Sequence, residues 1–248
     1  MCTVILLHRP GHAWPVLVAA NRDEMLDRAW DPPAAWWPGQ PEVTGGRDRL
    51  SGGTWMAANQ AGVMAAVLNR PGSLGPAAGK RSRGELPLLA LRADTARDAA
   101  ARIAALPAAE WRPFNMVLAD RDGGIFLRGE GHGRPAALPL LPGLSMITAL
   151  DPNDTASPRT ARHLPRFRAA PVPDPGSGDW ATWEALLADA SLAESRLDTL
   201  RVPPEGGFGT VCASLLAIGA AGVLCWRFAA GPAGTAPFVP VGDGAPPA

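Results

Sequence analysis

The feature that most constrains this chain is a pair of short apolar segments within its first two dozen residues. Residues 2–7 and 16–20 are apolar and partly β-branched, which is typical of buried strands. Residues 9–12, Arg-Pro-Gly-His, are turn formers. We therefore predict an antiparallel hairpin, in which the beginning of the first strand lies beside the end of the second.

This hairpin would bring Arg22 and Asp23 next to Cys2. Removal of the initiator Met would leave Cys2 with a thiol nucleophile and a free α-amine, whose pKa of about 7.7–8.0 suits a base. A neighbouring cation such as Arg22 lowers a thiol pKa, and Asp23 could orient the amine. A nucleophile–base pair of this kind is a known variant of the catalytic triad. The alternative is that Cys2 is a small apolar residue and that residues 22–24 form a solvated strand end.

Further motifs follow in order, and together they resemble a known family. Gly-Gly-Thr-Trp at 52–55, residues 62–69 and Ser-Arg-Gly-Glu-Leu at 82–86 come after Asn-Arg-Asp-Glu at 21–24. The set resembles the NRDE family, also called the Transport and Golgi organisation 2 family. That family is similar to N-terminal nucleophile hydrolases, which implies an α+β fold, a four-layer αββα sandwich of two antiparallel sheets. Its members are also associated with haem trafficking and with acyl-CoA or lipid metabolism.

Two asparagines are candidates for stabilising an oxyanion. Asn69 ends a predicted strand, and the resemblance to N-terminal nucleophile enzymes implies an amide donor at such a strand end. Asn115 begins another predicted strand and is the second candidate. Each also has a structural explanation, Asn69 as a turn former before Arg-Pro-Gly and Asn115 as a strand-edge residue.

The candidate substrate-binding residues are aromatic or polar. Residues 28–39 are rich in Pro and Trp and predict a loop without regular structure, whose indoles either line an apolar ligand pocket or fix the loop to the core. Arg83 lies at the predicted start of a helix and could meet an anionic group there. The Arg-rich segment 158–168 is expected to present a solvated basic face, or else to contact a phosphorylated ligand such as an acyl-CoA. The complete predicted set is Asn21, Glu24, Trp36, Trp37, Trp55 and Arg83.

Composition limits the classes of protein that fit. The 248 residues suit one domain, predicted over 1–230, with a poorly ordered Pro/Gly/Ala-rich tail at 231–248. Lys and Arg together number 23, as do Asp and Glu, so the chain lacks the basic character of a nucleic-acid binder. Three dispersed Cys argue against a disulfide framework or a zinc site. The absence of a signal-peptide pattern and of a membrane-spanning apolar run, which needs roughly 20 residues, predicts a cytoplasmic protein.

The sequence is consistent with two different functions. The first is an amidohydrolase in which Cys2 attacks a small N-acyl substrate without any cofactor. The second is a non-catalytic carrier that binds haem or an acyl-CoA in the same pocket, with haem iron held by Cys2, His8 or His12. The chain also departs from the family pattern, with Val211 where relatives tend to carry Arg and Met146 where they tend to carry Asn. The sequence leaves the substrate and the oligomeric state open.

Overall fold

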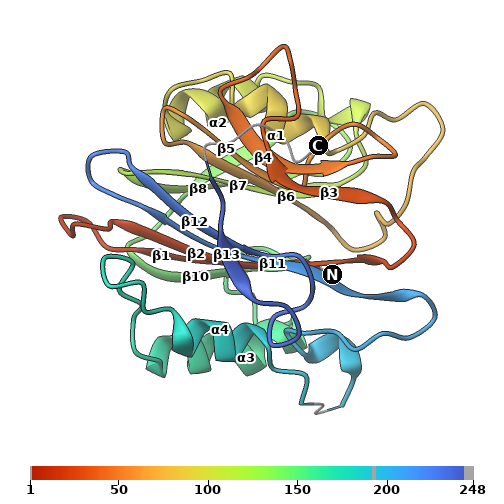
Figure 1. The fold of residues 1–248 in the computed structure, drawn as a ribbon. Coiled ribbons are helices and arrows are strands. Elements are labelled where there is room, and N and C mark those ends of the chain that lie inside the picture. Colours follow the sequence, from red (N-terminus) through yellow and green to blue (C-terminus); the bar gives the residue numbers. More distant parts are fainter. Residues whose placement is uncertain (1, 192–193, 243–248) are drawn as a thin grey trace.

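The computed structural model describes residues 2–191 and 194–242. Two antiparallel sheets pack face to face, and helices cover the outer side of each sheet (Figure 1). The predicted four-layer αββα sandwich is therefore confirmed. None of the helices in these residues has the length and apolar character that a membrane crossing requires.

The first sheet contains the predicted hairpin at its centre. Thr3 lies opposite Asn21, and His8 lies opposite Val16, so the hairpin has the expected register. The second strand of the hairpin extends beyond the predicted residue 20 and ends at Met25, still paired with β11. In spatial order the strands are β10 (Gly143–Ile147), β1 (Thr3–His8), β2 (Val16–Met25), β11 (Phe208–Ile218), β12 (Leu224–Ala229) and β13 (Phe238–Pro240).

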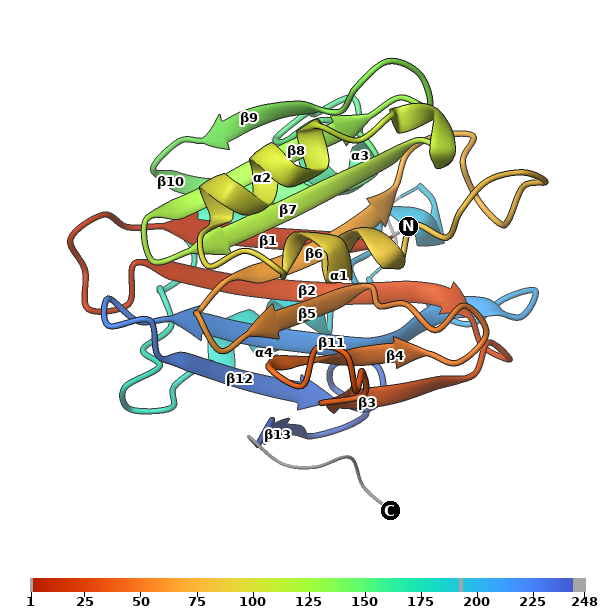
Figure 2. The ribbon, with the colours of Figure 1, turned by 90° about the horizontal axis from the view of Figure 1, so that it is seen from above.

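The second sheet has its strands in sequence order, as Figure 2 shows from above. Its two central hairpins, β5–β6 and β7–β8, each have turn residues between two apolar runs. The strands are β3 (Trp30–Ala34), β4 (Val43–Asp48), β5 (Met56–Asn59), β6 (Met64–Asn69), β7 (Phe114–Asp120), β8 (Gly123–Gly129) and β9 (Ala136–Leu140).

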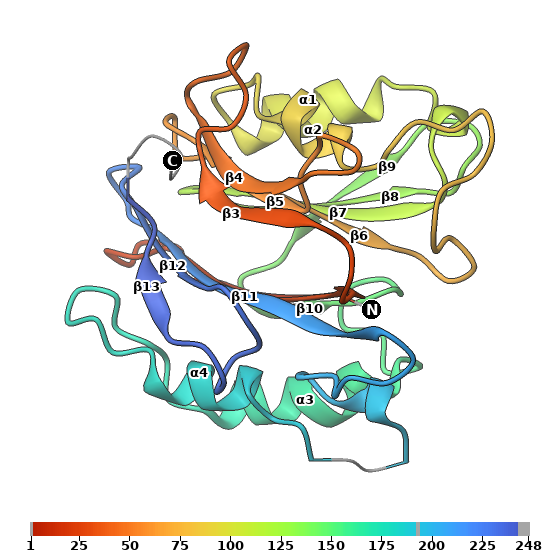
Figure 3. The same ribbon diagram turned by 45° about the vertical axis from the view of Figure 1, so that its right-hand side comes forward.

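The helices are short and lie in two outer layers (Figure 3). α1 (Glu85–Ala90) and α2 (Ala96–Ala104) cover the second sheet, while α3 (Pro158–Ala169) and α4 (Ala181–Leu187) cover the first. Two single-turn 3₁₀ helices, η1 (Ala108–Glu110) and η2 (Arg196–Asp198), join the neighbouring segments.

Strand alternation separates the apolar side chains into two layers on either side of the first sheet. Val4 and Leu6 of β1 pack between the sheets, in a cluster that includes Phe126 of the second sheet. Ile5 points the other way and packs with Trp183 in the layer beneath α3 and α4. This alternation fixes the side of the sheet on which every later side chain of β1 and β2 lies.

Two predicted irregular segments contain strands. The Pro/Trp-rich segment forms the edge strand β3, because an edge position tolerates Pro, which cannot donate a ladder hydrogen bond. The expected disordered tail adds β13 to the first sheet, where Phe238 is buried and its carbonyl accepts a hydrogen bond from Arg227. The prediction of a poorly ordered tail is wrong for this part, and residues 243–248 lie outside the described residues.

The glycine pair before Trp55 has two distinct roles. Gly52 has a φ of +71°, which favours glycine. Gly53 instead allows a close backbone contact, since a Cβ there would lie 2.6 Å from the carbonyl oxygen of Gly84. That carbonyl accepts a hydrogen bond from the Thr54 N–H, so the contact joins the start of β5 to the segment that carries Arg83.

We therefore expect Gly53→Ala to lower the free energy of unfolding by about 1–3 kcal/mol, as overpacking against backbone typically does. Gly39→Ala is the matched control, because a Cβ at Gly39 would meet no atom within 4 Å. Urea denaturation of both variants checks the prediction. Equal midpoints for the two variants would contradict it.

Stability should also fall in acid because of His163 in α3. This side chain is fully buried, its Nε2 lies 2.9 Å from the Asp198 carbonyl, and burial lowers its pKa from the usual 6.5 to about 4. Because the unfolded chain binds the proton more tightly, stability should be lost as the pH falls from about 6.5 to about 4. Urea titrations at several pH values across that range should show the free energy of unfolding falling with pH. His163→Gln should reduce this pH dependence, and His132→Gln, at an exposed position, should not.

Candidate active site

Cys2 lies at the start of β1 and faces the space between the two sheets. Its side chain is partly buried and packs against the inter-sheet cluster. The thiol donates a hydrogen bond to the backbone carbonyl of Asp23, with Sγ 3.6 Å from the oxygen. Burial raises the pKa of the Cys2 thiol, and the positive amino terminus and Arg22 oppose this effect. The sulfur therefore needs a base to become a nucleophile.

Arg22 shares the face of the sheet on which Cys2 lies. Its guanidinium stacks over the ring of Trp55, with Cζ 4.3 Å from the ring centroid. Nη2 lies 3.6 Å from a carboxylate oxygen of Glu24, while the buried Nη1 has no hydrogen-bond partner among the described residues. The side chain is only 5% exposed. Arg22 thus presents an unused donor within the pocket, held by an aromatic wall.

Asp23 points to the opposite face of the sheet. Its carboxylate accepts hydrogen bonds from Arg159 Nη1 at 2.9 Å and from Thr210 Oγ1 at 2.6 Å. Arg159 also donates to Thr3 Oγ1 at 2.9 Å. The predicted convergence therefore holds in part. The Arg22 side chain lines the same pocket as Cys2, whereas Asp23 contacts the sulfur through its backbone carbonyl, because adjacent strand residues alternate in direction.

Arg159 is the residue that the sequence analysis missed. It lies in α3 and is 1% exposed, so the prediction of a solvated basic face is wrong at this position. The helical period contained the signal, since Arg159, His163 and Phe167 recur at intervals of four and all are buried. The apolar character of Phe167 marks that face as the buried one.

The candidate amides are not directed at the sulfur. Asn69 lies opposite Phe114, whose ring packs beneath α1 and α2, so the register places Asn69 on the outer face. Asn115 lies on the inner face, but its Nδ2 already donates to the carbonyls of Thr148 and Leu150, and its Oδ1 accepts from Arg70. Asn21 donates both amide hydrogens to carbonyls of the segments around α4 and η2.

Of the three candidate tryptophans, only Trp55 lines the pocket beside Cys2. The Trp36 indole donates to Pro32 and is covered by Arg47, and that of Trp37 donates to Gly52. The second interpretation, a segment fixed to the core by its own indoles, describes these two residues. Glu24 remains near the site through its ion pair with Arg22.

The pocket is formed between the ends of β1, β2, β5, β6 and β11. It offers about 20 Å³ to the centre of a water molecule, which is room for one or two waters. Any larger ligand must therefore displace a wall residue. The lining consists of Cys2, Thr3, Val4, Ala20, Asn21, Arg22, Trp55, Met56, Ala66, Val67, Leu68, Cys212, Ala213 and Ser214.

The family model for Transport and Golgi organisation 2 matches residues 1–134, which include Cys2, Arg22, Asp23, Trp55 and Arg83. The chain belongs to this family. No curated protein matches it in sequence.

Solved structures establish the fold of this family member. The N-acylethanolamine-hydrolyzing acid amidase ortholog of Caenorhabditis elegans has a TM-score of 0.58 at 11% identity, over 87% of this chain and 92% of that one. The C2A mutant of conjugated bile acid hydrolase from Clostridium perfringens has a TM-score of 0.54 at 13% identity, over 99% and 95%. Penicillin V acylase from Agrobacterium tumefaciens has a TM-score of 0.51 at 14% identity, over 92% of this chain and 83% of that one. These enzymes have the N-terminal nucleophile hydrolase fold, and so does this chain.

The two departures from the family pattern have structural consequences. Val211 sits at a register shift between Thr210 and Cys212 in β11, where it packs in a small cluster with Phe228. Met146 is fully buried on the helix side of the first sheet. An apolar residue suits both positions, and neither brings a charge to Cys2.

The buried pair of Asp23 and Arg159 should dominate stability near the site. Arg159→Met should lower the free energy of unfolding by about 3–5 kcal/mol, because it leaves a buried carboxylate without its guanidinium. Glu85→Gln is the control, since it breaks an ion pair with Arg81 whose side chains are 46% and 36% exposed and should cost less than about 1 kcal/mol. Chemical denaturation of both variants measures the difference, and similar losses would contradict the assignment.

Proposed function

We propose that the protein is an N-terminal-cysteine amidohydrolase that acts on a small N-acyl substrate. The observation that carries the proposal is that Cys2 and Arg22 line the same inter-sheet pocket, with Arg22 Nη1 lacking a hydrogen-bond partner among the described residues. The named activities of the similar structures, an acid amidase, a bile acid hydrolase and a penicillin acylase, support the same class of reaction.

The reaction would use the α-amine that removal of Met1 exposes on Cys2. This amine takes the thiol proton, and Sγ attacks the amide carbonyl to form a tetrahedral intermediate. The amine then gives the proton to the leaving nitrogen, the C–N bond breaks, and an S-acyl enzyme remains. Water, deprotonated by the same amine, attacks the thioester, the C–S bond breaks, and the acid and the thiol are released. No cofactor enters any of these steps.

Arg22 is the group best placed to stabilise the developing oxyanion. Its buried Nη1 is a charged donor with no competing acceptor among the described residues. A preorganised donor in a water-poor site typically contributes several kcal/mol to such a step. Asn69 faces the outer layer, and both amide N–H groups of Asn115 already donate hydrogen bonds. Neither side chain can therefore donate to the oxyanion without rearrangement.

A carrier function for haem or an acyl-CoA is the competing proposal, and the pocket gives it less support. The space beside Cys2 has room for one or two water molecules, so a porphyrin could enter only if wall residues moved. Of the three predicted haem ligands, Cys2 lines this pocket, whereas His8 and His12 are not in its lining. A small acyl chain, in contrast, needs only the displacement of an apolar wall such as Trp55.

Replacing the nucleophile tests the proposal. Cys2→Ala should abolish release of amine from a panel of N-acyl amides, with a loss of about 10³-fold or more, as for other covalent nucleophiles. Cys225→Ala should leave the rate unchanged, because that thiol lies on β12 outside the pocket lining. Equal rates for the wild type and Cys2→Ala would exclude the mechanism.

Processing of the chain start gives a second test. A preparation that retains Met1 should be inactive, because its α-amine is no longer attached to the nucleophile. Intact mass spectrometry measures the processed fraction, and the specific activity should rise in proportion to it. Full activity in a preparation that retains Met1 completely would contradict the role of the Cys2 amine.

A further inference from the structure

Two neighbouring arginines, Arg83 and Arg112, have no acidic partner among the described residues. Arg83 donates to the carbonyls of Ser73 and Pro113 and to the Ser73 hydroxyl, all within 3.1 Å. Arg112 donates only to backbone carbonyls of the loop between β6 and α1, including those of Gly72 and Leu74. In the described part of the chain, neither guanidinium forms an ion pair with a carboxylate. Their hydrogen bonds hold the loop but leave both charges uncompensated.

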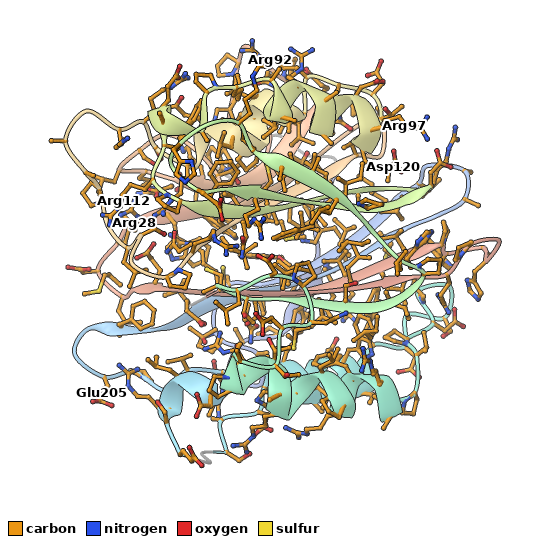
Figure 4. The ribbon with its side chains drawn as sticks, turned by 180° about the vertical axis from the view of Figure 1, so that it is seen from behind. Arg28, Arg92, Arg97, Arg112, Asp120 and Glu205 are labelled. Atoms are coloured by element: carbon orange, nitrogen blue, oxygen red, sulfur yellow. The ribbon has the colours of Figure 1, made fainter. Side chains whose placement is uncertain are left out.

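These arginines belong to a larger group around the pocket. The pKa of Arg83 is lowered from 12.5 to about 10, mainly by burial and also by the charges of Arg112 and Arg28, while those of Cys2 and Glu24 act in the opposite direction. All four groups are thus close enough to affect the charge of Arg83. Arg28 and Arg112 are seen at the same end of the molecule in Figure 4, away from Arg97.

The charges in this group do not balance. The cations are Arg22, Arg28, Arg83 and Arg112, and the carboxylates paired with them are Glu24 and Asp48. Four positive and two negative charges leave an excess of two. The whole chain, in contrast, has a formal net charge of zero. A concentration of like charge costs stability and attracts a counter-ion.

A second observation points from the pocket to a ligand. The Arg22 side chain lines the pocket and is only 5% exposed, and its Nη1 has no hydrogen-bond partner among the described residues. Arg83 and Arg112 lie outside the pocket lining. The pocket therefore has one cationic donor inside and two uncompensated guanidinium groups around it, which suits a ligand with a reacting carbonyl and a separate anionic group.

We propose that the arginine group of Arg83 and Arg112 binds an acidic substituent of the substrate, a carboxylate or a phosphate, while Cys2 attacks its amide. This inference rests on the proposed amidohydrolase function and narrows its substrate class to acidic N-acyl amides. It explains why two guanidinium groups are kept beside an apolar pocket without carboxylate partners.

Matched substrates test the inference. N-octanoylglycine is compared with N-octanoylglycinamide, and phosphorylated N-octanoylethanolamine with its unphosphorylated form, so that each pair differs only in the acidic group. The wild type should prefer the acidic member of at least one pair by about tenfold in kcat/KM. The pair with the larger ratio identifies carboxylate or phosphate as the group recognised. Equal kcat/KM within both pairs would overturn the proposal.

Substitution of the arginines should then show which residues recognise the acidic group. Arg83→Gln and Arg112→Gln should each reduce the acidic-to-neutral ratio by about threefold or more, and mainly through KM. Arg97→Gln is the control, because Arg97 is an exposed cation on α2 at the other side of the molecule in Figure 4 and should leave the ratio unchanged. An equal effect of all three variants would mean that net charge, and not this site, determines the preference, and would overturn the assignment.

Binding separates this inference from the proposed function. Calorimetry with the Cys2→Ala variant should show tighter binding of the acidic member of a pair, and Arg83→Gln in that background should remove the difference. If the wild type hydrolyses neither member but this binding preference is seen, the amidohydrolase proposal fails and the anion site stands. If hydrolysis is seen without any preference in rate or binding, the anion site fails and the amidohydrolase stands.

Discussion

The arrangement of this site depends on the alternation of side chains at the end of β2. Arg22 and Asp23 are neighbours in the chain, yet they lie on opposite faces of the first sheet, Arg22 towards Trp55 and Asp23 towards Arg159. The two sheets enclose one face and the helices enclose the other. A single dipeptide thus supplies a cation to the pocket and an anion to the layer beneath it.

The anion beneath the sheet is held more firmly than the cation above it. The Asp23 side chain is fully buried and bonded to Arg159 and Thr210, which come from α3 and β11. Removal of one partner from such a buried pair is expensive, so the end of β2 is fixed relative to β11 and α3. The Asp23 carbonyl, which accepts the Cys2 hydrogen bond, is fixed with it. Arg22 has an aromatic contact, a longer ion pair and an unused donor, which are the properties of a group that can respond to a ligand.

The surroundings of the pocket combine apolar walls with an excess of positive charge. Trp55 is held in place by the edge of Trp30, with ring centroids 5.8 Å apart, and Trp30 contacts Phe228 of the other sheet at the same distance. Arg83 and Arg112 are positioned mainly by backbone carbonyls, without an ion pair to a carboxylate among the described residues. A substrate that is apolar at its acyl end and acidic elsewhere would match both properties.

The sequence alone determined the hairpin of β1 and β2, because apolar periodicity and turn residues are local signals. It also placed Arg22 beside Cys2, since register follows from the turn. The layered fold was implied by the resemblance to the family. Only the tertiary structure showed that Asp23 turns away to a buried Arg159, that Asn115 is engaged by the chain after β10, that Asn69 faces the helices, and that Arg83 and Arg112 lack acidic partners. These facts depend on contacts between segments up to 187 residues apart, as between Asp23 and Thr210. No local pattern specifies which distant group will occupy a donor or an acceptor, because that choice is made only when the layers pack.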